Sequence, residues 1–271
     1  MKITVLGSGA AEAIPDPFCR CEVCETARRD GGPEVRGRSA ALVNDDLLID
    51  LGPDVVSAAN RLNLYLGGLR TVLITHRHSD HWLPGNLHWR EPGFAATPVV
   101  PLTVYGPQDA LVDIEPHLDR GTELSARVVS AGERWTAGRY LVTAVPATHG
   151  GGKLEPLLYV IDDGTYRLFY ATDTASLGEE AWDILRPLGP MDVVLLDETS
   201  GLSSGGEGHH GFERFLDTRA QMIDNGVLGP QSALIAHHFS HNGKLTHRAL
   251  VERFEPYGVS VSYDGLTICL E

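Results

Sequence analysis

The sequence predicts a mixed α/β (α+β) fold in which two β-sheets pack face to face and helices cover their outer faces. Short apolar segments typical of strands are followed by longer amphipathic segments typical of helices, and this order occurs twice along the chain. No linker or low-complexity tract divides the 271 residues. We therefore expect one domain over residues 1–271, built of two pseudo-repeated halves.

Each expected element follows from the spacing of its apolar residues and from the turn-forming residues that bound it. The expected strands are residues 3–6, 40–43, 47–50, 72–75, 102–105, 140–145, 157–161, 168–171, 193–197 and 233–236, with 259–263 and 266–270 as a closing hairpin around Asp264-Gly265. The expected helices are residues 55–62, 82–88, 107–118, 179–185, 211–225 and 246–254.

Composition excludes some classes of function. The formal net charge is −14 and no basic cluster is present, which disfavours an extended nucleic-acid surface, because such binding depends on Lys and Arg side chains. No segment approaches the roughly 20 apolar residues of a membrane span, and the first residues do not form a signal-peptide pattern. A cytoplasmic protein without membrane contact is the expectation.

The densest group of metal-binding side chains directly follows the expected strand at 72–75, in the run Thr75-His76-Arg77-His78-Ser79-Asp80-His81. Side chains two residues apart share a face of an extended segment, so His76 and His78 can point the same way. Asp80 and His81 begin the next element and point at a neighbouring position. The segment can therefore serve two adjacent metal ions; the alternatives are a solvated polar loop and a mononuclear structural zinc.

Further ligand-type residues occur where other expected strands end. They are His149, Asp173, Asp197, His237 and His238. A single such residue is usually a hydrogen-bonded turn residue, but together with the histidine-rich run they indicate one site. Cys19, Cys21 and Cys24 form a second group, and three clustered cysteines suit half of a metal site better than a disulfide framework.

These residues resemble the signature of the metallo-β-lactamase superfamily, His-x-His-x-Asp-His followed by a later His, Asp and His. The resemblance covers essentially the whole chain and implies a four-layered αββα sandwich with the site at the edge between the sheets. It also implies a ligand role for seven residues. His76, His78 and His149 would bind one metal, Asp80, His81 and His238 the other, and Asp173 would bridge them.

The N-terminal segment narrows the resemblance. Leu6-Gly7-Ser8-Gly9 and Cys19-Arg20-Cys21-Glu22-Val23-Cys24 are similar to the phosphonate-pathway cyclic-phosphate phosphodiesterases and to the pyrroloquinoline quinone biosynthesis B proteins. In the phosphodiesterases, a histidine three residues beyond the last active-site histidine completes a structural zinc site. That position is His241 here, next to the zinc-binding loop at 19–24. The alternative is that these cysteines are reduced and bind no metal.

The resemblance implies a dinuclear-metal-dependent hydrolase. A phosphodiesterase acting on a small cyclic phosphate or nucleotide-like diester is favoured, with attack by a hydroxide held between zinc or manganese ions, iron being a further alternative. Asp80 and His210 are the expected catalytic residues, His210 fitting the proton donor better than His209, and Asp197 is expected to orient a ligand histidine. The alternatives are hydrolysis of a lactone, lactam or thioester, RNA 3′-processing, and a quinone-biosynthesis role. The expected partner is a small anionic substrate, and the oligomeric state is left open, a homodimer included.

Overall fold

A computed structural model describes residues 1–206 and 208–271, and its strands form two seven-stranded sheets. The first sheet has the order β14-β1-β2-β3-β4-β5-β6; β3 to β6 pair in parallel, whereas the pairs that involve β1 or β2 are antiparallel. Its strands are β1 (Lys2–Gly7), β2 (Ala40–Val43), β3 (Leu47–Ile49), β4 (Thr71–Leu73), β5 (Leu102–Gly106), β6 (Leu124–Val128) and β14 (Thr267–Cys269).

The second sheet has the order β13-β12-β11-β10-β9-β8-β7. Strands β10 to β13 pair in parallel, and β9 is antiparallel to both β8 and β10, so β8 runs in the same direction as β10. The carboxyl ends of β8, β10, β11 and β12 therefore meet at one edge. The strands are β7 (Arg134–Ala137), β8 (Tyr140–Pro146), β9 (Leu157–Asp162), β10 (Arg167–Ala171), β11 (Met191–Asp197), β12 (Leu228–His237) and β13 (Ser260–Val261).

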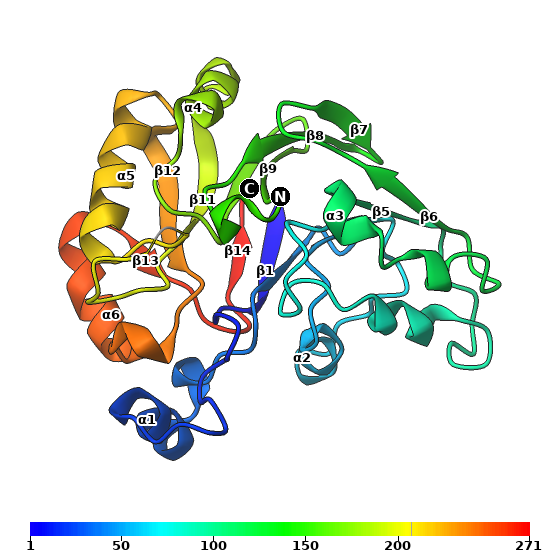
Figure 1. The fold of residues 1–271 in the computed structure, drawn as a ribbon, viewed down its shortest axis with the longest axis horizontal. Helices are drawn as coiled ribbons and strands as arrows, with labels where there is room; N and C mark the ends of the chain where they lie inside the picture. The colour runs from blue at the N-terminus through cyan, green and yellow to red at the C-terminus, as the bar shows by residue number, and fades with distance from the viewer. Residues whose placement is uncertain (207) are drawn as a thin grey trace.

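Helices cover the outer faces of both sheets. The α-helices are α1 (Glu22–Asp30), α2 (Val55–Arg61), α3 (Gln108–Leu111), α4 (Glu179–Leu185), α5 (Phe212–Asp224) and α6 (His247–Phe254). The short 3-10 helices are η1 (Gly32–Glu34), η2 (Pro84–Arg90), η3 (Glu115–His117), η4 (Gly150–Gly152), η5 (Arg186–Leu188), η6 (His241–Gly243) and η7 (Glu255–Tyr257). Figure 1 shows α5 and α6 beside the second sheet and α2 beside the first. No helix among the described residues is long and apolar enough to cross a membrane.

Three hydrophobic clusters separate the four layers. The central cluster joins the facing sides of the two sheets and includes Val5 and Tyr159. A second cluster packs α4, α5 and α6 against the second sheet, for example through Phe215, and a third packs α2 against the first sheet, for example through Ala58. Each sheet is thus apolar on both faces, which explains its nearly continuous apolar strands. The predicted αββα sandwich is confirmed.

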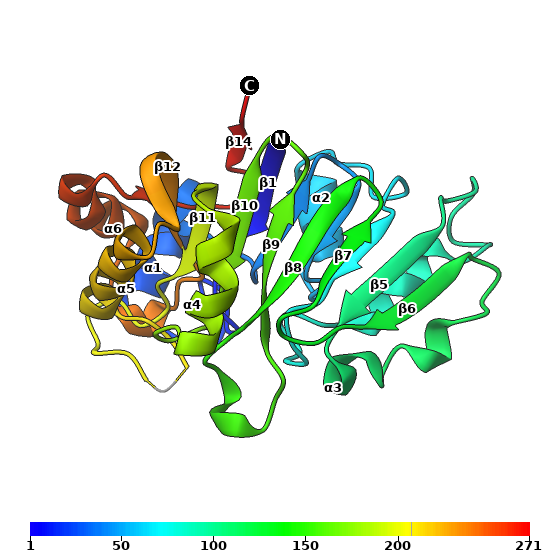
Figure 2. The ribbon, with the colours of Figure 1, turned by 90° about the horizontal axis from the view of Figure 1, so that it is seen from above.

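The predicted closing hairpin around Asp264-Gly265 is wrong. Strand β13 pairs with β12 in the second sheet, whereas β14 pairs with β1 in the first, so the chain crosses between the sheets at this turn. The Asp264 carboxylate accepts hydrogen bonds from the backbone N–H groups of Ser8 and Gly37, which fixes the crossing. Figures 1 and 2 show the consequence: β14 and β1 lie side by side, with both chain ends close together.

Five other elements differ from expectation. Strands β6 and β7 and helix α1 were not predicted. Strand β6 alternates apolar and polar residues but is mostly exposed, and β7 is only four residues long. The helix expected over residues 107–118 is broken into α3 and η3. Residues 84–90 form a 3-10 helix in place of an α-helix, which keeps the segment after the histidine-rich run tightly wound.

Candidate metal centre

The ligand-type side chains gather where strands of both sheets end. His76 to His81 follow β4, and Asp50 follows the neighbouring strand β3. From the second sheet, His149, Asp173 and His238 follow β8, β10 and β12, and Asp197 is the last residue of β11. Because these strands end at the same edge of the sandwich, residues far apart in sequence meet there.

Three imidazoles form the first half of the centre. His76 Nε2 lies 2.9 Å from His78 Nδ1, and His149 Nε2 lies 3.1 Å from the same atom. Nitrogen ligands around one tetrahedral zinc are about 3.3 Å apart, given Zn–N bonds of about 2.05 Å. The three nitrogens therefore fit the coordination of a single ion. His76 is fully buried and His78 is exposed.

Asp80, His81, His238 and Asp173 form the second half. Asp173 Oδ2 lies 2.6 Å from His81 Nε2 and 3.0 Å from His238 Nε2, and Asp80 Oδ2 lies 3.1 Å from His81 Nε2. Nevertheless, His81 Nε2, His238 Nε2 and Asp173 Oδ2 are buried atoms without an aligned hydrogen-bond partner among the described residues. Such close atoms that do not align as donor and acceptor fit ligands of a shared cation.

Asp173 connects the two halves. Its second carboxylate oxygen, Oδ1, lies 3.7 Å from Nε2 of His149, which belongs to the first half. Burial raises the pKa of Asp173, but the neighbouring His238 and His81 lower it, and the net shift is well below the ordinary value. The donor set of imidazole and carboxylate groups suits divalent zinc, manganese or iron.

Buried acceptors and hydroxyls hold the ligand histidines in position. Asp50 Oδ2 lies 2.6 Å from His81 Nδ1, and its Oδ1 accepts the Thr75 backbone N–H at 2.8 Å. The Thr199 hydroxyl lies 2.8 Å from His238 Nδ1 and donates to Asp197 Oδ2 at 2.9 Å. Fixing one ring nitrogen in this way determines the orientation and tautomer of the other, which is the one that can ligate.

The backbone is strained at the same place. Asp50, Asp173 and His238 have φ values of 62°, 53° and 66°, in the left-handed region that non-glycine residues seldom occupy. Each of the three follows a strand end and turns its side chain back into the site. Local strain that persists at several residues of one cluster is typical of a functional site.

The two histidines of the 209–210 pair have different surroundings. His209 Nδ1 lies 3.0 Å from Asp197 Oδ2, and its ring stacks on His238 and meets His149 edge to face. The imidazole of His210 is fully buried, with Nε2 2.8 Å from the hydroxyl of Thr218 in α5. The preference for His210 as proton donor does not fit this geometry, because its ring points into the helix layer.

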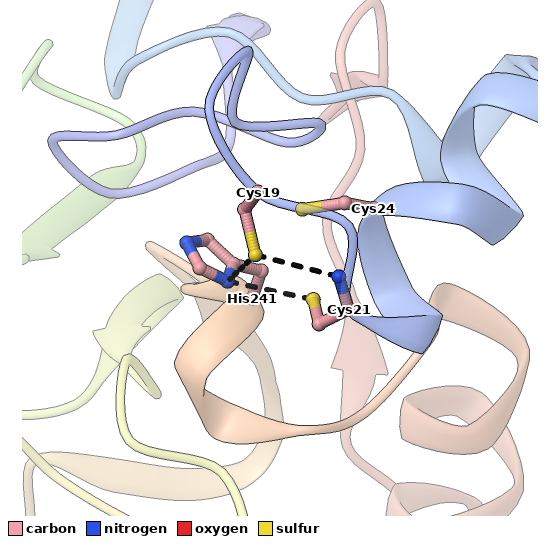
Figure 3. A group of neighbouring side chains, drawn as sticks. All are labelled: Cys19, Cys21, Cys24 and His241. Atoms are coloured by element: carbon pink, nitrogen blue, oxygen red, sulfur yellow. Dashed lines mark hydrogen bonds between the residues drawn. The ribbon is translucent and has the colours of Figure 1, made fainter.

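The cysteine group meets His241 (Figure 3), which lies three residues beyond the ligand residue His238. Sγ atoms of Cys19 and Cys21 lie 3.7 and 3.6 Å from His241 Nδ1, and the ligand atoms of all four residues lie within 4.8 Å of one another. Sulfur and nitrogen ligands of a tetrahedral zinc are about 3.6 Å apart. The four side chains thus fit a closed zinc site, which would fasten the N-terminal loop to the loop that carries His238.

Comparison with known proteins identifies the family. A model of the β-lactamase superfamily domain matches residues 46–245, about three quarters of the chain. The chain belongs to this superfamily. Its match with an octanoyltransferase of Porphyromonas gingivalis (strain ATCC BAA-308 / W83) is 27% identical over 292 residues and covers 100% of this chain but only 52% of that protein. The chain therefore spans about half the length of this curated relative.

Solved structures share the superfamily fold. A diphosphatase of the PhnP family superposes with a TM-score of 0.77 at 21% identity, covering 100% of this chain and 98% of the other. Zinc-bound PqqB from Methylobacterium extorquens gives 0.73 at 21% identity, with 100% of both chains covered. Human tRNase Z, short form, gives 0.67 at 17% identity, again with 100% of both chains covered. At these identities the likeness concerns the fold.

The structure brings together all seven residues that the resemblance indicated, as well as Cys19, Cys21, Cys24 and His241. It does not bring in His237, whose ring is buried between Ser39 and Ser262. Sequence reasoning missed Asp50, Thr75 and Thr199. Asp50 could have been found, because it ends an expected strand with an acidic residue, as Asp173 and Asp197 do.

Proposed function

We propose that this chain is a metal-dependent phosphodiesterase that hydrolyses a small cyclic phosphate or nucleotide-like diester. The observation that carries the proposal is the position of Asp173, whose two carboxylate oxygens face different histidine groups. A shared carboxylate of this kind is typical of two-metal sites, among them those of phosphatases and nucleases. The names of two structural neighbours, the PhnP-family diphosphatase and yeast PDE1, are consistent with phosphate-ester chemistry.

His76, His78 and His149 would hold one ion, and Asp80, His81 and His238 the other, with Asp173 between them. Bound there, two divalent ions would supply Lewis acidity and water of lowered pKa. The protein fixes the ligands beforehand, through Asp50 on His81 and through the Thr199–Asp197 pair on His238. These hydrogen bonds hold the ligand side chains in the orientation that coordination requires.

His209 is the proposed proton donor. Asp197 accepts from Nδ1 of His209, which leaves Nε2 as the nitrogen available to substrate. The His209 side chain is 27% exposed. When the bond between phosphorus and the departing oxygen breaks, that oxygen takes the proton from Nε2 and leaves as an alcohol. The oxygen of a water molecule forms the new bond to phosphorus, and the proton that this water releases returns to Nε2 of His209.

Cys19, Cys21, Cys24 and His241 are proposed to bind a structural zinc. His241 lies three residues beyond His238, so a zinc at this position would brace the loop of a catalytic ligand. Three thiolates and one imidazole leave no open position on a tetrahedral ion, so an ion bound here could not bind water or substrate.

Turnover of the protein loaded with zinc, manganese or iron tests the proposal. The substrates are bis(p-nitrophenyl) phosphate, a 2′,3′-cyclic nucleotide and a dinucleoside diphosphate, and metal content is measured on the same samples. We expect hydrolysis of at least one ester, and a loss of at least a thousandfold in Asp173→Asn but not in the exposed control Asp183→Asn. Full metal loading without hydrolysis of any phosphate ester would refute the proposal.

Hydrolysis of an acyl thioester is the second candidate, and the octanoyltransferase name of the curated relative favours it. The matched part is only about half of that protein, so the name need not describe this half. An octanoyl thioester belongs in the same assay. Faster turnover of the thioester than of every phosphate ester would replace the first candidate by the second.

A further inference from the structure

An apolar pocket opens on the outer face of the first sheet, away from the ligand side chains. It has a volume of about 250 Å³, and its floor includes Val72 of β4 and Leu102 of β5. Helix α2 contributes Ala59 to one wall. At the rim, Tyr65 and Trp89 are 68% and 52% exposed, so two aromatic rings border the entrance.

One cation lines this apolar space. Arg90, at the end of η2, donates from Nη2 to the backbone carbonyl of Val100 at 2.7 Å, but its Nε and Nη1 are buried and have no partner among the described residues. Burial lowers the pKa of Arg90, and the neighbouring Tyr65 raises it by a smaller amount. Among the described residues, no carboxylate contributes to this shift. Leaving buried donors unpaired is unfavourable, and more so for a charged group.

The pocket and the arginine together define the chemistry of a ligand. Since a cavity of about 150 Å³ holds benzene, with six non-hydrogen atoms, a pocket of this volume suits a ligand of roughly ten. Arginine hydrogen-bonds strongly to carboxylates. A monoanion would neutralise the single guanidinium, whereas a phosphomonoester, with about −1.5 to −2 charge, would leave excess negative charge against apolar walls.

We propose that this pocket, with Arg90 at its edge, binds an apolar monocarboxylate of about ten non-hydrogen atoms, such as a medium-chain fatty acid. The chain would lie against Val72, Leu102 and Ala59, and the carboxylate would accept from one of the two unpaired nitrogens of Arg90, Nε or Nη1. This site is separate from the metal centre and does not depend on the reaction catalysed there. A backbone contact links it to the centre, because Leu51 lines the pocket and donates from its backbone N–H to the His81 carbonyl.

Isothermal titration of the metal-loaded protein with acetate, octanoate, octan-1-ol and octyl phosphate tests the proposal. Octanoate should bind at least tenfold more tightly than each of the other three. Acetate controls for carboxylate binding to the metals, octanol for the apolar contribution alone, and octyl phosphate for the choice of head group.

Two variants separate the charge from the cavity. Arg90→Met should weaken octanoate binding at least tenfold and leave octanol binding unchanged, whereas the exposed control Arg248→Met should change neither. Ala95→Trp, which fills the pocket from its rim, should weaken both ligands. Octanoate binding no tighter than acetate, or equal octanoate binding by Arg90→Met and the parent protein, would overturn the proposal.

Discussion

Replacing Asp50 by Asn should remove a metal without removing a ligand. In the parent protein, Asp50 Oδ1 accepts the Thr75 backbone N–H at 2.8 Å and Oδ2 lies 2.6 Å from His81 Nδ1. An asparagine has one carbonyl oxygen for these two donors. If the amide nitrogen faces His81, the proton of that ring must move to Nε2, which then no longer has a lone pair for a metal.

The other orientation of the amide is also costly. It would set the amide nitrogen against the buried N–H of Thr75, and an unpaired buried donor costs about 1–3 kcal/mol. From the first orientation we expect a 10- to 100-fold loss of affinity at the second half of the centre, about 1.4–2.7 kcal/mol. Because each molecule adopts one orientation or the other, the variant should either hold one metal weakly or be less stable than the parent.

Chelator competition followed by metal analysis measures the affinity, and urea unfolding of the metal-free protein measures the stability. Asp45→Asn is the matched control, because that carboxylate is exposed and pairs only with Lys2. Parental affinity for both catalytic metals in Asp50→Asn would show that the Asp50–His81 contact does not select the tautomer of His81.

Three further predictions concern other parts of the molecule. Cys21→Ser should lose one zinc and melt at a lower temperature, while Cys269→Ser, on the exposed end strand, should keep full metal content and stability by the same two measurements. His209→Asn should lower kcat about 10²- to 10⁴-fold at full metal content, whereas His210→Asn should lower stability more than it lowers turnover per folded molecule. A larger loss of kcat in His210→Asn than in His209→Asn would favour His210 as the proton donor, as the sequence predicted. Burial, reinforced by the neighbouring Asp197 carboxylate, raises the pKa of Glu198 well above its ordinary value, so the folded state holds a proton that the unfolded chain releases. The resulting stabilisation is complete below the unfolded pKa of about 4.3 and declines as the pH rises toward the folded pKa. In thermal melts, Glu198→Gln should therefore gain stability relative to the parent as the pH is raised from about 5 to 8. A difference in melting temperature that stays constant over this range would contradict the prediction.

The sequence predicted most of the fold because the strands and helices of each layer show a characteristic spacing of apolar residues. Strands buried on both faces, such as β9 and β11, are nearly continuous apolar runs, and α5 shows helical spacing. The prediction of the closing hairpin failed because it depends on contacts between residues far apart in sequence. The turn at Asp264 has the composition of a hairpin turn, but the flanking strands pair with different sheets, and the contacts of Asp264 with Ser8 and Gly37 fix the crossing.

The metal ligands could be predicted because their residue types and order are unusual, whereas the groups that orient them could not. Thr75 and Thr199 are common residues, and their roles depend on hydroxyl positions that only the folded backbone fixes. His209 and His210 are adjacent and chemically identical. Their different directions follow from packing, since His210 contacts Thr218 across the helix layer while His209 faces Asp197.

The cysteine group also has a consequence for chain entropy. Cys19 and His241 are 222 residues apart in sequence, so a zinc between them would close a loop that contains most of the chain. By the relation used for covalent cross-links, restricting an unfolded loop of this length is worth about 5 kcal/mol. Unlike a disulfide, such a link survives a reducing environment and is opened by a chelator. Unfolding of this protein should then be governed by free zinc concentration as well as by temperature.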